Sequence, residues 1–210
     1  TVPVETGDKV RKIIKGNIKK NVGFDVVSNP EFLREGSAIE DTLHPDRIVI
    51  GSDSDKAIGI MKKIYSPIKA PLIITNIKSA ELIKHASNAF LATKISFINS
   101  VARICELSGA DIEEVAEGMG HDKRISRHFL NAGIGYGGSC FPKDSQAFIK
   151  IAENYGYDSK MLKATNEINE EQKKIFLDKV KKALGSINGK NIAVLGLAFK
   201  PDTDDMRFAP

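Results

Sequence analysis

Cysteine is scarce in this sequence, and its scarcity restricts the kinds of site the protein can have. Cys105 and Cys140 are the two cysteines among 210 residues, so neither a framework of several disulfides nor a zinc site of paired CxxC motifs can form. The four histidines are spaced neither as metal ligands with these cysteines nor as the base of a cysteine protease: His44, His85, His121 and His128. We therefore expect no metal site, and the low cysteine content favours a cytoplasmic protein.

Long apolar runs are also missing, since no stretch approaches the roughly 18 residues that a membrane-spanning helix needs. The first residues show no signal-peptide pattern. Basic residues number 31 and acidic residues 27, and the net charge of +4 suits an anionic ligand without forming a nucleic-acid patch. With 41% hydrophobic and 28% charged residues, the composition indicates an ordinary globular protein. We expect neither a membrane nor a nucleic acid as partner.

Residues 1–76 alternate short apolar runs with helical patterns, which is typical of a mostly parallel α/β sheet. The expected strands lie at 25–28, 47–51 and 72–75. The expected helices lie near 7–19, 37–41 and 55–66. Three strands make an incomplete α/β domain, so this region is predicted to be the end of a larger one.

The middle of the chain is predicted to be helical. No glycine or proline interrupts residues 79–108, so a single helix there would be about 45 Å long. Its apolar residues nearly encircle it, which predicts burial as a domain spine or as a subunit interface. Shorter helices are expected at 111–117 and from Pro142 to about 155, and a long helix is expected at 158–184.

After Gly185 and Gly189, residues 191–195 are predicted to form a buried strand. One strand cannot bury itself, so it would begin a further α/β domain. We expect a mixed α/β protein in three parts: the end of a Rossmann-like domain at 1–76, an all-α central domain at 77–187, and the first strand of a second Rossmann-like domain at 188–210.

The run GGSCFPKD places Cys140 at or beside a helix start, because Ser139 is a suitable N-cap and Pro142 suits an early helical position. Backbone N–H groups and the helix dipole at such a position favour the thiolate, the nucleophilic form of cysteine. Asp144 follows four residues later and can face the same side. A buried, inert cysteine is the alternative interpretation.

Two further segments combine polar groups in a way that core packing does not explain. Lys84 and Asn88 are four residues apart on the long helix, where a charged group needs a partner or a function. A lysine that reaches solvent from the helix edge is the alternative. The loop that begins NPE, directly after a predicted strand, contains Glu31 and Glu35, which can act as acid, base or hydrogen-bond acceptor, or be ordinary loop carboxylates.

Together these segments resemble the UDP-glucose/GDP-mannose dehydrogenase family over essentially the whole chain. NPEFLREGSAIED, ELIKHASNAFLATKISFINSVARICE and FLNAGIGYGGSCFPKD follow the family's order, and GLAFKPDTDD resembles the start of its C-terminal domain. The opening TVPV is similar to the end of the family's N-terminal NAD domain, with Glu5 where glycine is expected.

The resemblance implies oxidation of a sugar C6 alcohol to a carboxylate, with NAD as cofactor, through a cysteine thiohemiacetal and thioester. In the family's pattern Cys140 matches the nucleophile, and Lys84 and Asn88 match the pair that stabilises charge on the substrate oxygen. Three other positions match catalytic residues: Asp144, which orients Lys84 and a water, Glu31, which assists thioester hydrolysis, and Thr1, which positions water.

The resemblance also implies a UDP-sugar substrate. Its contacts would come from the loop 131–138 and from separate side chains elsewhere: Phe32, Leu33, Arg124 and Lys200, with Asn131, Tyr136 and Gly137 in the loop. Glu35 and Lys143 would contact the cofactor.

We expect no GxGxxG dinucleotide fingerprint anywhere in the sequence, and the resemblance places the family's NAD fingerprint in a region that would precede Thr1. We therefore expect a piece truncated at both ends, which alone neither binds NAD well nor oxidises substrate. UDP-glucose is the expected substrate, and UDP-N-acetylmannosamine or GDP-mannose is the enzymatic alternative. An alternative of another class is a non-catalytic assembly core that forms a homodimer through the 79–108 helix.

Overall fold

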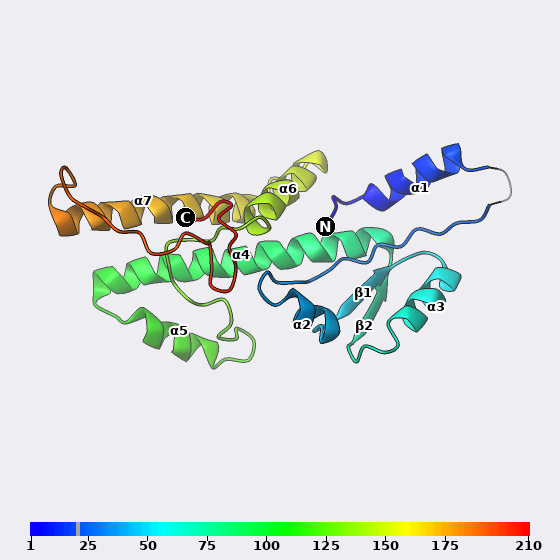
Figure 1. The fold of residues 1–210 in the computed structure, drawn as a ribbon, viewed down its shortest axis with the longest axis horizontal. Helices are drawn as coiled ribbons and strands as arrows, with labels where there is room; N and C mark the ends of the chain where they lie inside the picture. Colours follow the sequence, from blue (N-terminus) through cyan, green and yellow to red (C-terminus); the bar gives the residue numbers. More distant parts are fainter. Residues whose placement is uncertain (20–21) are drawn as a thin grey trace. The chain divides into compact units, whose positions relative to one another are not determined.

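The computed structural model describes residues 1–19 and 22–210, which divide into two compact units, Thr1–Ser87 and Asn88–Pro210 (Figure 1). One helix, α4 (Ile77–Ser108), runs through the boundary and contributes to both units. Throughout the described residues, no helix is both long and apolar enough to cross a membrane. The predicted mixed α/β class is confirmed: the described residues are mostly helical, with α4 as the longest helix, and contain two parallel strands.

The first unit is built on two parallel strands, β1 (Ile48–Gly51) and β2 (Leu72–Thr75), which pair residue for residue. Each strand contains two isoleucines, with a valine in β1 and a threonine in β2, as expected where side chains pack on a pleated surface, and β1 is buried along its whole length. The helix α3 (Asp55–Ile64) connects the two strands, because parallel strands need a crossover connection. Two helices complete the unit, α1 (Thr6–Asn17) and α2 (Ala38–Leu43).

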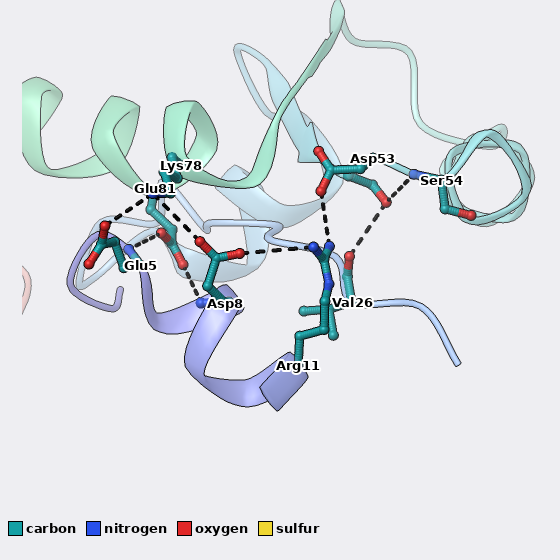
Figure 2. Close-up of polar contacts among 10 residues, drawn as sticks. Glu5, Asp8, Arg11, Val26, Asp53, Ser54, Lys78 and Glu81 are labelled. Carbon is teal, nitrogen blue, oxygen red and sulfur yellow. Dashed lines mark hydrogen bonds and ion pairs between the residues drawn. The ribbon is translucent and has the colours of Figure 1, made fainter. Parts of the chain in front are cut away.

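The start of α1 is held by a buried carboxylate on α4 (Figure 2). Glu81 is 2% exposed and accepts hydrogen bonds from the N–H of Glu5 at 2.8 Å and from the N–H of Gly7 at 2.7 Å. The first N–H groups of a helix lack intrahelical partners and attract negative charge, so Glu81 caps α1 from a neighbouring helix. Gly7 permits this approach, because a Cβ there would overlap the side chain of Ile77.

The second unit has only helices as regular structure within its described residues. Its elements are the rest of α4 followed by α5 (Ile112–Gly120), α6 (Phe141–Asn154) and α7 (Lys160–Leu184). Ile98 of α4, Ala116 of α5 and Leu130 form a fully buried apolar cluster. The helices α4 and α7 are joined by a buried hydrogen bond from Ser96 Oγ to the Thr165 carbonyl at 2.8 Å. The unit therefore packs around the second half of α4.

The predicted helices, and the strands at 47–51 and 72–75, are confirmed to within a few residues at their ends. The strand predicted at 25–28 is wrong, since its only ladder contact is an isolated bridge between Ser28 and Gly51, and one pair does not make a ladder. The strand predicted at 191–195 is also wrong: no strand among the described residues pairs with it, and Leu195 is 96% exposed. The three-domain division stays a prediction.

Glu5 has a φ of 74°, in the left-handed region that costs a residue with a Cβ about 1–2 kcal/mol. Its carboxylate pairs with Lys78 Nζ at 3.0 Å, a half-exposed contact of small value. Glu5→Gly should therefore stabilise the protein by about 0.5–1 kcal/mol, or about 2 °C in Tm by calorimetry, after the extra flexibility of unfolded glycine is subtracted. Glu5→Ala is the control, because it loses the ion pair and keeps the strain. Equal Tm values for the two variants would contradict this account.

Candidate active site

Cys140 lies at the start of α6 and is exposed, whereas Cys105 on α4 is buried. Cys140 is itself the N-cap residue, so the prediction of Ser139 as N-cap is wrong by one residue. The hydroxyl of Ser139 lies 3.7 Å from the Cys140 Sγ, and Pro142 is in the first turn. Cys140 is therefore accessible to a ligand and lies at a helix start, as a nucleophile of this kind requires.

Asp144, one turn into α6, is 2% exposed and accepts a hydrogen bond from Asn88 Nδ2 of α4 at 2.6 Å. Its backbone N–H donates to the Cys140 carbonyl at 2.8 Å, so the carboxylate and the thiol share one helical turn. Lys143 Nζ lies 3.8 Å from Asp144 Oδ1. The second unit thus brings four of the predicted site residues together: Asn88, Cys140, Lys143 and Asp144.

In the first unit, Thr1, Glu31 and Lys84 lie together. Lys84 is 5% exposed and its Nζ is 3.3 Å from Glu31 Oε1, the same oxygen that accepts a hydrogen bond from Thr1 Oγ1 at 3.4 Å. Burial alone would raise the pKa of Glu31, but a backbone hydrogen bond and the charge of Lys84 outweigh it, so the pKa lies below 4.5. Glu31 is therefore ionised at neutral pH and supplies the partner that a buried lysine requires.

The ring of Phe32 lies beside two cations. Lys84 Nζ is 5.3 Å and Arg47 Cζ is 3.9 Å from its centroid, within the range of cation–π attraction. Arg47 also donates to Ser87 Oγ at 3.3 Å. Sequence reasoning missed Arg47 because it treated the residue as the start of a strand. A charged residue directly before a fully buried strand was the signal that could have found it.

Polar contacts tie down both ends of the loop 131–138. Asn131 Oδ1 accepts a hydrogen bond from Arg127 Nη1 at 2.6 Å. Tyr136 is 6% exposed, and its hydroxyl donates to Asn166 Oδ1 of α7 at 2.8 Å. Burial raises the pKa of Tyr136 to about 12, so this donor stays protonated at neutral pH.

The last residues of the chain lie against the end of the same loop. The N–H of Gly138 donates to the Arg207 carbonyl at 2.9 Å, and a Cβ at Gly138 would come within 2.7 Å of the Phe199 ring. Gly137 faces the backbone of residue 208 equally closely. Lys200 Nζ, from the same segment, lies 5.9 Å from the Phe199 centroid. Gly137 therefore allows a close approach by the backbone of residue 208, and Gly138 allows a close approach by the Phe199 ring.

The remaining predicted ligand contacts lie on exposed or half-buried positions. Leu33 is 42% exposed, and Glu35 is half-buried two residues further along the same loop. The side chain of Arg124 is 89% exposed and pairs with Asp122 at 2.6 Å rather than with another predicted site residue. The roles of these three side chains stay predictions.

The spacing GxGxxG does occur, at Gly133–Gly138, so the expectation that it is absent from the sequence is wrong. It lies between α5 and α6 rather than after a strand, so it is not a dinucleotide fingerprint. A glycine-rich loop that leads into a helix start suits a phosphate group. Among residues 1–19 and 22–210 there is no cluster of three or more His, Cys, Asp or Glu that could hold a metal ion.

Comparison with known proteins shows the class of protein to which the chain belongs. Residues 1–69 match an NAD binding domain and residues 78–171 match a central domain, and both domains are those of nucleotide-sugar dehydrogenases. Both models describe the UDP-glucose/GDP-mannose dehydrogenase family, and the chain belongs to that family.

Individual relatives agree. UDP-glucose 6-dehydrogenase TuaD of Bacillus subtilis is 57% identical over 210 residues, which are 100% of this chain and 46% of that protein. The solved UDP-glucose dehydrogenase of Pyrobaculum islandicum is 44% identical, with a TM-score of 0.95 over 100% of this chain and 48% of its own. A UDP-D-ManNAc dehydrogenase of Pyrococcus horikoshii is 28% identical, with a TM-score of 0.86 over 100% and 50%. The chain spans about half the length of these relatives.

NAD is the cofactor of this family, since residues 1–69 match the family's NAD binding domain. The residues present fit part of a dinucleotide site, because β1, α3 and β2 form the parallel strand–helix–strand unit on which such sites are built. The glycine-rich turn that holds the pyrophosphate does not follow β1 or β2.

The effect of Lys84 on the pKa of the Glu31 carboxyl can be measured. Lys84→Met should raise the pKa of Glu31 from its lowered value, because the carboxyl keeps its burial and loses the cation that offsets it. Since the folded pKa lies below 4.5, the pair stabilises the protein above that pH, and the contribution is lost as the pH falls through the folded pKa. Carboxyl ¹³C NMR titration of Glu31 measures the shift.

Lys78→Met is the matched control, since Lys78 pairs with Glu5 and Asp8 instead of Glu31. It should leave the Glu31 titration unchanged. An unchanged Glu31 pKa in Lys84→Met itself would show that the pair does not hold the carboxyl ionised.

Proposed function

We propose that the protein is an NAD-dependent UDP-glucose 6-dehydrogenase, which oxidises the C6 alcohol of UDP-glucose to the carboxylate of UDP-glucuronate. The observation that carries the proposal is the exposed thiol of Cys140 at the start of α6. A four-electron oxidation in one site needs a nucleophile that holds the aldehyde between its two stages. The names of relatives at 57% and 44% identity support the same substrate. A cytoplasmic location fits two cysteines that are both free thiols.

Cys140 performs the covalent chemistry in this proposal. NAD, when bound, supplies a hydride acceptor for both oxidations at C6. Between them, the Cys140 thiolate attacks the C6 aldehyde, a C–S bond forms, and a thiohemiacetal results. After the second oxidation the carbon is a thioester. Water attacks it, the C–S bond breaks, and the carboxylate and the thiol are released.

The surrounding polar groups stabilise charge and handle protons. The Asn88 amide and the Lys84 ammonium donate to the substrate oxygen as negative charge develops on it. Asp144 accepts one N–H of Asn88 and so fixes the direction of the amide. Glu31, ionised at neutral pH, accepts a proton from the water that attacks the thioester, and the hydroxyl of Thr1 beside it positions that water.

Ligand binding is assigned from the glycine-rich loop and separate side chains. The backbone N–H groups of loop 131–138 suit a diphosphate, because glycines let the backbone approach it closely. The proposed UDP-sugar contacts are Phe32, Leu33, Arg124, Asn131, Tyr136, Gly137 and Lys200, and the proposed cofactor contacts are Glu35 and Lys143.

A dehydrogenase for UDP-N-acetylmannosamine or GDP-mannose is the alternative within the family. The solved UDP-D-ManNAc dehydrogenase shares 28% identity with the chain, against 44% for the solved UDP-glucose dehydrogenase. This difference favours UDP-glucose. Turnover of UDP-N-acetylmannosamine faster than UDP-glucose would reverse the assignment.

Cys140→Ser tests the covalent role. In the enzyme that contains this chain, UDP-glucuronate formation should fall on the order of 10³-fold, because a serine hydroxyl is a poor nucleophile without a base and gives an ester instead of a thioester. Product is measured by chromatography with NAD and UDP-glucose. Cys105→Ala, at the buried cysteine, should keep the activity. Formation of UDP-glucuronate by Cys140→Ser at the unaltered rate would contradict the covalent role of Cys140.

A second function, assembly, is favoured by one face of α4. Phe90, Phe97 and Ile104 are 66%, 51% and 64% exposed, and their spacing of seven residues places them on the same side of the helix. Large apolar side chains in such a row are typical of protein–protein interfaces. We propose that α4 forms a homodimer through this face.

The 210-residue chain separates assembly from catalysis. At micromolar concentration it should sediment as a dimer of the 22.9 kDa chain, since the apolar face of α4 is complete within it. It should produce no NADH from UDP-glucose and NAD, because no glycine-rich turn for the pyrophosphate follows β1 or β2. A monomer would contradict the assembly role, and NADH formation would contradict the incomplete cofactor site.

A further inference from the structure

The loop that leads to Cys140 has no regular secondary structure, yet side-chain amides pair with its backbone. At Gly133, the N–H donates to Asn99 Oδ1 of α4 at 2.8 Å. The carbonyl of the same residue accepts a hydrogen bond from Gln172 Nε2 of α7 at 2.7 Å. One loop residue is therefore held from both sides by carboxamides of two different helices.

A third carboxamide holds Tyr136. Asn169 Oδ1 accepts from the Tyr136 N–H at 2.7 Å, and Asn169 Nδ2 donates to the Tyr136 carbonyl at 3.2 Å. This two-bond pairing reproduces what a neighbouring β-strand would give. A Cβ on the preceding Gly135, whose φ is 123°, would lie 2.8 Å from Asn169 Oδ1, so glycine is required for the contact.

The three side chains are buried: Asn99 is 0%, Asn169 is 4% and Gln172 is 9% exposed. A buried carboxamide costs free energy unless it is hydrogen-bonded, and here four carboxamide atoms pair with four backbone groups of a single loop, while Asn99 Nδ2 has no partner among the described residues. The loop contains four glycines in residues 131–138, which makes it expensive in conformational entropy to order. The carboxamides offset that cost.

We propose that Asn99, Asn169 and Gln172 are positioning residues, which hold the backbone of residues 133–136 in the conformation that binds the nucleotide sugar and presents Cys140. The inference rests on the proposed function of the loop and the thiol. Its physical basis is pre-organisation: a loop already held in its binding conformation loses less entropy when the ligand arrives.

Asn169→Asp tests the clamp with almost no change in shape. The carboxylate keeps an acceptor for the Tyr136 N–H but loses the donor and faces the Tyr136 carbonyl with negative charge. In the enzyme that contains this chain, loss of one buried hydrogen bond of this kind should raise the KM for UDP-glucose about tenfold, with a smaller effect on kcat. The rate of alkylation of Cys140 by iodoacetamide, which needs no turnover, should also change relative to the unaltered protein.

The pH dependence of the Cys140 alkylation rate distinguishes a positioning role of Asn169 from a general loss of structure in the variant. In acid, the protonated carboxyl that Asn169→Asp introduces donates to the Tyr136 carbonyl and restores the clamp, and this carboxyl is readily protonated because burial disfavours the anion. The ratio of variant to unaltered alkylation rate should therefore return toward one as the pH falls, at temperatures well below Tm. Asn154→Asp is the matched control at an exposed position of α6 and should give a ratio of one throughout.

Gln172→Glu is the second variant, which removes the single donor to the Gly133 carbonyl and remains informative if Asn169→Asp does not fold. Unchanged KM and alkylation rate at every pH in a folded variant would overturn the inference. If Cys140→Ser retains full activity while the alkylation ratio of Asn169→Asp still changes, the proposed function fails and the clamp on the loop stands.

Discussion

A polar group taken out of water must find a partner, and this constraint organises the segments around α4. In the first unit, Glu81 accepts two N–H groups at the start of α1, and His85 Nε2 lies 2.8 Å from the Val2 carbonyl. In the second unit, Asn88 donates to Asp144 at the start of α6. Each partner belongs to an irregular segment or to a helix end, where backbone or side-chain groups lack regular partners. The buried polar side chains of α4, Glu81, His85 and Asn88, thereby fix the positions of the segments that they contact.

The two carboxylates of the candidate active site are stabilised differently, which suits different tasks. Glu31 is half-exposed and ionised beside the buried Lys84, so it can exchange a proton with water. Asp144 is buried against the neutral amide of Asn88, where it can direct a donor but has little access to solvent. These environments suit the proposed roles, in which Glu31 transfers a proton and Asp144 orients the Asn88 amide.

Local signals predicted most of the fold and the position of the thiol. The long helix was predicted at 79–108 and lies at Ile77–Ser108, because an uninterrupted apolar period needs no knowledge of distant residues. Cys140 was placed at a helix start from Pro142 and its neighbours for the same reason. The strands predicted at 25–28 and 191–195 failed because a strand depends on a partner elsewhere in the chain.

The carboxamides could not be found in this way, since Asn169 and Gln172 lie on a helix that is rich in lysine and glutamate. Their partners are the backbone groups of a loop more than thirty residues away, at Tyr136 and Gly133. No side-chain pattern marks a backbone group as an acceptor. The signal that could have found Asn169 and Gln172 is their spacing: two polar residues three positions apart on the buried side of an amphipathic helix can contact a neighbouring backbone.

The choice of amides for this clamp follows from charge. An amide has both an acceptor and donors, so Asn169 can pair with the N–H and the carbonyl of Tyr136 at once. A carboxylate would repel the carbonyl, and an ammonium would repel the N–H. Either would also add a charge beside a loop that is proposed to bind a diphosphate. Neutral carboxamides order the glycine-rich backbone without adding a charge. The electrostatic potential at the thiol is then determined by the N-terminus of α6, where Cys140 lies.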